Sequence, residues 1–123
     1  MKFERRGAEG PVITGFSGRG FRVDEAVYAA LRITPERAEQ WAPPPIDALA
    51  EADLAPLLVL HPLPEFILLG TGATLVRPSP ALTAALAARN IGLEVMDSRA
   101  AARAWGVLRA ELRWIGGALY PLS

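Results

Sequence analysis

The chain has 123 residues, which suits one domain around one hydrophobic core and is too short for two. Its 13 basic and 13 acidic side chains cancel, so it lacks the bulk positive charge that proteins binding nucleic acids or membrane surfaces usually carry. It contains no Cys, which excludes disulfides, thiolate metal sites and Cys nucleophiles.

The charges are unevenly spread along the chain. Residues 1–72 hold seven basic and ten acidic side chains, whereas residues 73–123 hold six arginines and three acidic side chains. Such a split is typical of two solvated faces, and antiparallel self-association or an anionic partner for the second half is the alternative. No apolar signal core follows the first residues and no apolar run reaches the length of a membrane span, so we expect a cytoplasmic protein without membrane insertion. The oligomeric state is left open.

The first third of the chain predicts a leader followed by short strands. Residues 1–10 are polar and contain glycines, which indicates a flexible leader before a single domain over residues 11–123. Apolar residues at 12–16 and 21–23 flank a glycine turn and predict a β-hairpin. The spacing of apolar residues over 25–33 favours a further strand.

The middle of the chain predicts a connector and a short helix. Three prolines after Trp41 remove backbone donors, so this stretch is interpreted as a loop anchored by a buried Trp41, with a Pro-rich ligand for another domain as the alternative. Asp53 is placed to cap a short helix over residues 54–60. His61 is the sole histidine, and it is interpreted as a helix-end residue rather than a metal ligand or base.

The following segment predicts a strand, helix, strand unit. The apolar run at 65–69 indicates a buried strand, and Ser79 with the proline after it is typical of a helix start. Asn90 suits a left-handed helix end, and residues 93–96 form the next strand. This order of elements predicts a parallel, right-handed crossover.

The last third predicts one more helix and a final strand. Asp97 or Ser98 caps a helix that carries Trp105 on its apolar face. Residues 114–119 follow as a strand rich in glycine. We expect Trp105 and Trp114 to lie in the core.

Polar residues gather where the two parallel strands end, a place where open α/β sheets commonly bind ligands. Gly70-Thr71-Gly72 lacks the third glycine of a dinucleotide site and the Lys-Ser/Thr pair of a P-loop, so a tight structural turn and a ligand-binding loop are both open interpretations. If the charged side chains converged, they could act as a general acid, a general base and a clamp for an anionic ligand. The alternative is that they form helix caps and ion pairs. The candidate ligand-binding residues are Gly70, Thr71, Gly72, Glu94, Met96, Asp97, Arg99, Glu111 and Arg113.

No residue set amounts to a catalytic constellation. Ser98 with His61 and Asp97 lacks the strained Gly-x-Ser-x-Gly turn of a serine nucleophile. We therefore predict no catalytic residue, no metal ligand and no cofactor.

Several stretches resemble one family of small α/β proteins. They are the glycine pair at 70–72, residues 89–98, Ala100-Ala101, and residues 108–113. The family is the Mth-like domain family, which includes the mitochondrial NADH dehydrogenase (complex I) assembly factor 3 and the adipogenesis-associated Mth-like domain protein.

The resemblance implies a three-layer α/β single domain with a mixed central β-sheet, a parallel crossover unit and a β-hairpin extension. It implies no established enzymatic activity. Two departures stand out, since the family's Thr-Tyr-Asn appears here as Ala104-Trp105-Gly106 and its Glu-Gly-Arg as Glu111-Leu112-Arg113.

Two functions follow from these observations. The first is a non-enzymatic protein that binds a partner or helps to assemble a complex, with a respiratory complex subunit as the partner that the resemblance implies. The alternative is a small-molecule or anion-binding protein or enzyme with its site at the Gly70–Gly72 loop and the Asp97–Arg99 helix start.

Overall fold

The computed structural model describes residues 10–123. The leader predicted over residues 1–10 therefore lies, apart from Gly10, outside the described residues.

A mixed sheet of five strands forms the centre of the molecule, in the order β5-β4-β8-β6-β7. The strands are Ala38–Gln40 (β5), Leu31–Ile33 (β4), Gly116–Leu119 (β8), Phe66–Gly70 (β6) and Gly92–Met96 (β7). β6 pairs in parallel with β7 and β8, whereas β4 pairs antiparallel with β8 and β5. The predicted parallel crossover is confirmed, and it forms one half of this mixed sheet.

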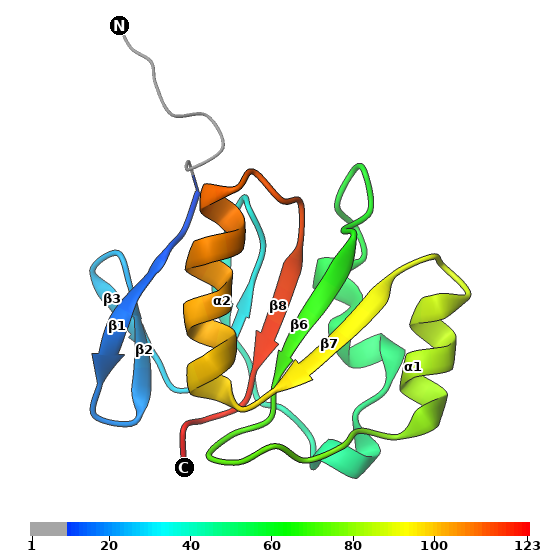
Figure 1. The fold of residues 1–123 in the computed structure, drawn as a ribbon. Helices are drawn as coiled ribbons and strands as arrows, with labels where there is room; N and C mark the ends of the chain where they lie inside the picture. Colours follow the sequence, from blue (N-terminus) through cyan, green and yellow to red (C-terminus); the bar gives the residue numbers. More distant parts are fainter. Residues whose placement is uncertain (1–9) are drawn as a thin grey trace, which may run out of the picture.

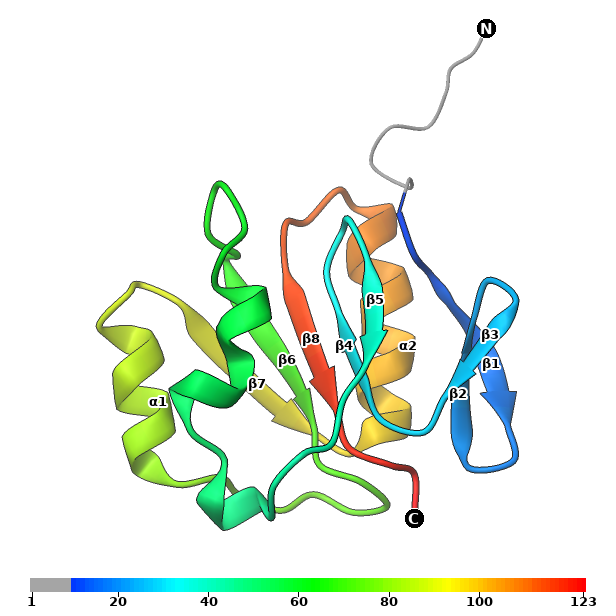
Figure 2. The same cartoon turned by 180° about the vertical axis from the view of Figure 1, so that it is seen from behind.

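Helices cover both faces of the sheet. Helix α2, Ser98–Ala110, packs on one face (Figure 1), and the other face carries α1, Pro80–Ala87, with the 3-10 helices η2, Ile46–Ala48, and η3, Glu51–Leu57 (Figure 2). Side chains that are fully buried fill both spaces, with Trp105 and Leu68 on the α2 side and Leu69 and Leu86 on the α1 side. The predicted three-layer α/β fold is confirmed.

A second, antiparallel sheet of three strands lies beside α2 (Figure 1). It consists of β1, Ile13–Ser17, β2, Gly20–Val23, and β3, Ala26–Tyr28, so the predicted hairpin is present and one strand larger.

The single strand predicted over residues 25–33 is instead two strands. β3 completes the small sheet, the chain bends at residues 29–30, and β4 enters the main sheet. The reason is burial: Val27 is exposed, whereas Leu31 and Ile33 are fully buried against α2 and β8. Apolar spacing alone does not reveal which sheet each half joins.

The helix boundaries follow the predicted local signals. Ser79 Oγ accepts a hydrogen bond from Ala81 N at 3.1 Å, with Pro80 in the first turn. Asn90 has φ 62°, the left-handed conformation expected after α1.

Two predictions in the η3 region are wrong. Asp53 lies inside η3, where its carboxylate accepts from Ala50 N at 2.9 Å, and the helix is of the 3-10 type and ends at Leu57 rather than at residue 60. His61 is exposed and lies beyond that end. The physical reason is that Asp53 caps Ala50 N from the third helical position, so η3 begins at Glu51, three residues earlier than expected. Pro56 has no amide to donate to Asp53 O, which instead accepts from Arg32 Nη1 at 2.8 Å.

The two tryptophans expected in the core have different positions. Trp105 is fully buried, and its Nε1 donates to Pro11 O at 3.1 Å. Trp114 is only half-buried, because it precedes β8 at the edge of the molecule, where its Nε1 donates to Pro62 O at 2.7 Å. The expectation that Trp114 lies in the core is therefore wrong.

Trp41 anchors the Pro-rich connector within the domain, as predicted. Its ring is buried, packs edge-on against Tyr120 with 5.7 Å between centroids, and its Nε1 donates to Leu119 O at 3.4 Å.

Candidate functional site

The carboxyl ends of β6 and β7 lie side by side, as the crossover predicts. Gly70 is paired with Met96 in the parallel register, and Thr71 N donates to Met96 O at 2.9 Å. Thr71 Oγ1 also donates to Thr74 O at 2.7 Å and accepts from Val76 N at 3.0 Å. The loop after β6 is thus folded back upon itself.

Ser98 binds this loop to the rest of the domain. Its Oγ accepts from Gly72 N at 2.8 Å and donates to Tyr120 O at 2.8 Å, and its own N donates to Gly72 O at 2.9 Å. Ser98 is fully buried. The backbone amides of Gly72 and Ser98, which a phosphate-binding loop would offer to a ligand, are therefore used within the protein.

Glycine is required at positions 70 and 72 for two different structural reasons. Gly72 has φ +102°, a conformation that side chains disfavour, and a Cβ there would lie 3.3 Å from Pro121 O. A Cβ on Gly70 would lie 2.8 Å from Ser98 Oγ and 2.9 Å from Ser98 Cα. Gly70 is needed for close packing of α2 on β6, and Gly72 for the turn.

Asp97 and Arg99 lie at the start of α2. The Asp97 carboxylate accepts from Ala100 N at 2.9 Å, which makes it the N-cap. The Arg99 guanidinium lies 4.7 Å from the centroid of the Phe16 ring, so this side chain contacts the small sheet instead of the glycine loop.

Glu94 and Met96 project from the face of β7 on the α2 side. Leu93 and Val95 pack toward α1, and side chains alternate along a strand, so Glu94 and Met96 lie on the opposite face. Met96 is partly buried in the α2-side core, whereas Glu94 is exposed.

Glu111 and Arg113 lie at the opposite end of α2 from Asp97. Arg113 donates to Glu65 at 2.7 Å, close to the start of β6. Hydrogen bonding to Arg113 lowers the pKa of Glu65, and the bond from Trp114 N adds to this; hydrogen bonding to Glu65 raises the pKa of Arg113. The structure therefore does not bring Glu111 and Arg113 together with the glycine loop.

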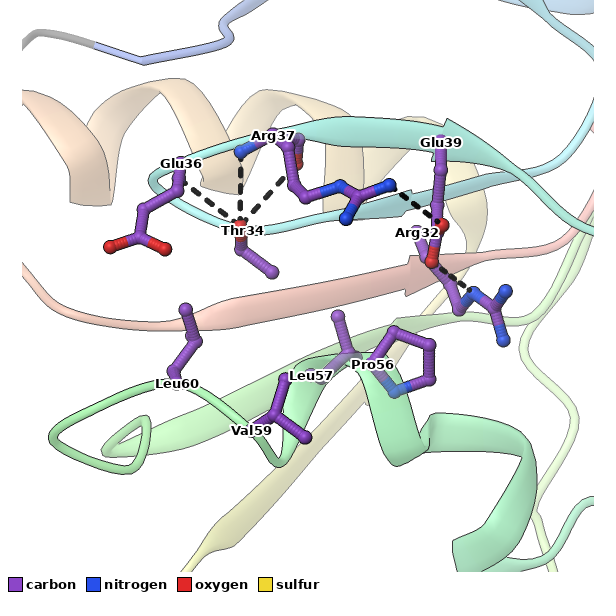
Figure 3. A pocket seen from close by; sticks show the side chains of 9 residues that line it. All are labelled: Arg32, Thr34, Glu36, Arg37, Glu39, Pro56, Leu57, Val59 and Leu60. Atoms are coloured by element: carbon purple, nitrogen blue, oxygen red, sulfur yellow. Dashed lines mark hydrogen bonds and ion pairs between the residues drawn. The ribbon is translucent and has the colours of Figure 1, made fainter.

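A hollow of about 180 Å³ between the β4–β5 turn and η3 was not predicted (Figure 3). Thr34 Oγ1 accepts from the backbone amides of Glu36 and Arg37 and holds this turn, while Pro56, Leu57, Val59 and Leu60 line the opposite wall. Glu39 lies 3.1 Å from Arg32 and 3.5 Å from Arg37, and Glu36 also lines the hollow, so two arginines and two glutamates offset each other in formal charge.

A larger groove of about 520 Å³ runs between α1 and β7. Sequence reasoning missed it, although one signal was present: no charged residue occurs over residues 78–88. Its walls are mostly apolar and consist of Arg77, Pro78, Pro80, Thr83, Ala84, Ala87, Leu93 and Val95.

The part of the chain that the structure describes offers no cluster of three or more His, Cys, Asp or Glu side chains placed to hold a metal ion. Within the same residues, no helix has the length and apolar character needed to cross a membrane.

Comparison with known sequences adds independent information. Residues 13–120 match the model of a family described as a protein of unknown function (DUF498/DUF598). The chain is 29% identical over 119 residues to NADH dehydrogenase [ubiquinone] 1 alpha subcomplex assembly factor 3 of Danio rerio, a match that covers 96% of this chain and 68% of the relative. The protein of the same name from Bos taurus is 30% identical over 110 residues, which is 89% of this chain and 60% of the relative.

Solved bacterial structures have the same fold. A protein of Bordetella parapertussis superimposes with a TM-score of 0.80 at 28% identity, over 92% of this chain and 97% of its own. A Mth938-like domain of Bordetella pertussis gives a TM-score of 0.80 at 24% identity, over 100% of this chain and 92% of its own.

Proposed function

We propose that this chain, which belongs to the DUF498/DUF598 family of proteins of unknown function, is a non-enzymatic protein that binds a protein partner during assembly of a larger complex. The similarity to complex I assembly factor 3, which extends over 96% of the chain, is the observation that carries this proposal. A subunit of a respiratory complex is the partner class that this similarity suggests.

The geometry of the strand ends supports a binding role over catalysis. Gly72 and Ser98 hydrogen-bond to each other, Thr71 Oγ1 bonds to Thr74 O and Val76 N, and Asp97 caps α2. Groups already engaged in the fold are poorly placed to move protons or to stabilise a developing charge in a substrate.

Affinity capture tests the proposal. A tagged chain is produced at native level in its own host, crosslinked, and purified beside an untagged control. We expect one or a few proteins to copurify in near-stoichiometric amount. The proposal is abandoned if quantitative mass spectrometry finds no protein enriched above the untagged control.

The alternative function is a small-molecule or anion site at the Gly70–Gly72 loop and the Asp97–Arg99 helix start. The adjacent carboxyl ends of β6 and β7 are the observation that favours it. Thermal-shift screening against nucleotides and anionic metabolites tests it, because a ligand that binds the folded state raises the melting temperature with its concentration. A raised melting temperature that Asp97→Asn abolishes supports this site; an unchanged melting temperature across the screen removes it.

We also propose a cytoplasmic location and no nucleic-acid partner, on the grounds of the balanced charge and the absence of cysteine. Fractionation of host cells and a filter-binding assay with DNA and RNA test these two statements.

A further inference from the structure

Strand β7 has a free edge. It is the last strand of the main sheet and pairs with β6 alone among the described strands. Gly92 N donates to Glu65 O, and Met96 O accepts from Thr71 N, so these backbone groups point toward β6. Because backbone direction alternates along a strand, the N–H and C=O groups of Leu93 and Val95 point away from the sheet.

A groove with mostly apolar walls runs along this edge. Figures 1 and 2 both show α1 standing to the side of β7 instead of over the middle of the sheet. The space between them is the groove of about 520 Å³, walled by Leu93 and Val95 on one side and by Thr83, Ala84 and Ala87 on the other. An added strand at this place would lie next to β7 and contact α1, which already packs against β7.

The remaining sheet edges are less suitable. β3 and β5, which are edge strands of the small and the main sheet, have only three residues each, and Glu39 of β5 is paired with two arginines. β1 has an irregular register between Ile13 and Gly15 and is flanked by α2. Short strands and bulges are devices that prevent strand addition. β7 has five residues in regular register.

We propose that β7 receives an extended segment of a protein partner as a further strand, with a basic residue opposite Glu94 and apolar residues on either side of it. This proposal rests on the partner-binding function proposed above and specifies its surface.

The charges decide between possible occupants. The residue opposite Glu94 in an added strand projects on the same face as the exposed Glu94 carboxylate, where a Lys or Arg would form a favourable cross-strand pair. The residues before and after it project into the groove, whose walls are apolar apart from Arg77 and Thr83. Pairing of two copies over the full length of β7 would place two Glu94 carboxylates opposite each other, which is unfavourable. The charge pattern therefore selects a different protein over a second copy.

Peptide selection tests the sequence preference. Random octapeptides displayed on phage are selected on the immobilised wild-type chain, on Glu94→Arg and on Glu111→Arg, a matched change at the far end of α2. We expect the wild-type and Glu111→Arg pools to be enriched at least tenfold in apolar-basic-apolar sequences, and the Glu94→Arg pool to favour an acidic central residue. Pools without this pattern, or a pattern that Glu94→Arg leaves intact, would overturn the proposal.

A second test uses the captured partner and separates this proposal from the proposed function. Val95→Pro removes one outward N–H at an edge position where Pro is tolerated, and Val95→Thr keeps that donor. With both variants folded by circular dichroism, we expect Val95→Pro to lower partner recovery at least tenfold and Val95→Thr to retain it. Undiminished recovery with Val95→Pro refutes the β7 surface while partner binding stands. If the wild type captures nothing, the proposed function fails, and the peptide selection alone decides whether β7 accepts a strand.

Discussion

A few individual residues at turns and helix ends adopt a backbone conformation that most residue types disfavour. Gly72, Asn90 and Leu112 all have positive φ angles, and two of the three are residue types that tolerate them. Leu112 is the exception. These positions allow direct tests by substitution.

Gly72→Val is expected to destabilise the domain by about 1–3 kcal/mol, because a β-branched residue is strained at φ +102° and its Cβ would crowd Pro121 O. Arg77→Ala, an exposed change five residues away, is expected to stay within about 0.5 kcal/mol of the wild type. Urea denaturation of both variants measures the difference. Equal midpoints for Gly72→Val and the wild type would contradict the backbone explanation.

Asp97→Asn is expected to leave stability nearly unchanged, whereas Asp97→Ala should cost about 1 kcal/mol. Asn accepts the hydrogen bond from Ala100 N about as well as Asp does, and Ala cannot. Melting curves of the two variants provide the measurement. If Asp97→Asn keeps its stability but loses partner or ligand binding, the charge has a functional role beyond capping.

Leu112→Gly is expected to stabilise the protein by about 1 kcal/mol. Leu112 follows the C-cap of α2 with φ 65° and an exposed side chain, a position where helices usually have glycine because a Cβ is strained there. The Mth-like resemblance, which has Glu-Gly-Arg at this point, agrees with that reasoning. Differential scanning calorimetry decides, and a lower melting temperature for Leu112→Gly would show that side-chain contacts outweigh the strain.

Among the elements, α2 connects several separate parts of the fold. Trp105 binds it to the chain before β1, Ser98 to the glycine loop and to Tyr120, and Asp97 caps its start. Burial of Arg109 in its last turns lowers the pKa of that side chain, and Arg109 Nη1 donates to Arg113 O at 2.6 Å. One helix therefore holds together the small sheet, the main sheet and the C-terminal residues.

Ser98→Ala is expected to be more destabilising than Ser79→Ala, although both remove a serine at a helix start. Ser98 is fully buried, and its loss leaves Gly72 N and Tyr120 O without partners, at about 1–3 kcal/mol for each buried group. The Ser79 cap is exposed, so its loss should cost about 1 kcal/mol. Chemical denaturation ranks the two variants, and a Ser98→Ala cost at or below that of Ser79→Ala would argue against the structural role.

In the molecule as a whole, Tyr120 links the C-terminal segment to the Pro-rich connector. Its hydroxyl donates to Pro44 O at 2.6 Å, and burial, with Asp53 contributing, raises its pKa to about 12. The unfolded chain has a Tyr pKa of about 10. Between about pH 10 and about pH 12, the Tyr120 hydroxyl therefore keeps its proton in the folded state and loses it in the unfolded chain.

Stability should consequently fall at alkaline pH. The contribution of Tyr120 is complete below about pH 10 and is lost as pH rises through about 12, by about 2–3 kcal/mol in total. Tyr120→Phe should be less stable at neutral pH, by about 1 kcal/mol for the lost hydrogen bond, and less sensitive between pH 10 and pH 12. Urea unfolding at intervals from pH 8 to pH 12 compares the two proteins, and parallel curves would refute the assignment.

While the three-layer arrangement was implied by the family resemblance, the sequence patterns by themselves determined the parallel crossover, the caps at Ser79 and Asp97 and the turn at Asn90. These features depend on neighbours within a few residues, where capping side chains, prolines and apolar spacing act directly on the backbone. The sequence also predicted that the strand ends at Gly70 and Met96 lie side by side, because a parallel crossover brings the carboxyl ends of its two strands to the same edge of the sheet.

Only the tertiary structure decided what those strand ends do. Ser98 engages Gly72 and Tyr120, and Arg113 pairs with Glu65 at the far end of the sheet, so the candidate residues lie in separate places. Segments distant in the chain likewise decide the division of residues 25–33 between two sheets, the partial burial of Trp114 and the groove beside β7. Hydrogen-bond partners and burial across such distances arise from packing, which no local pattern specifies.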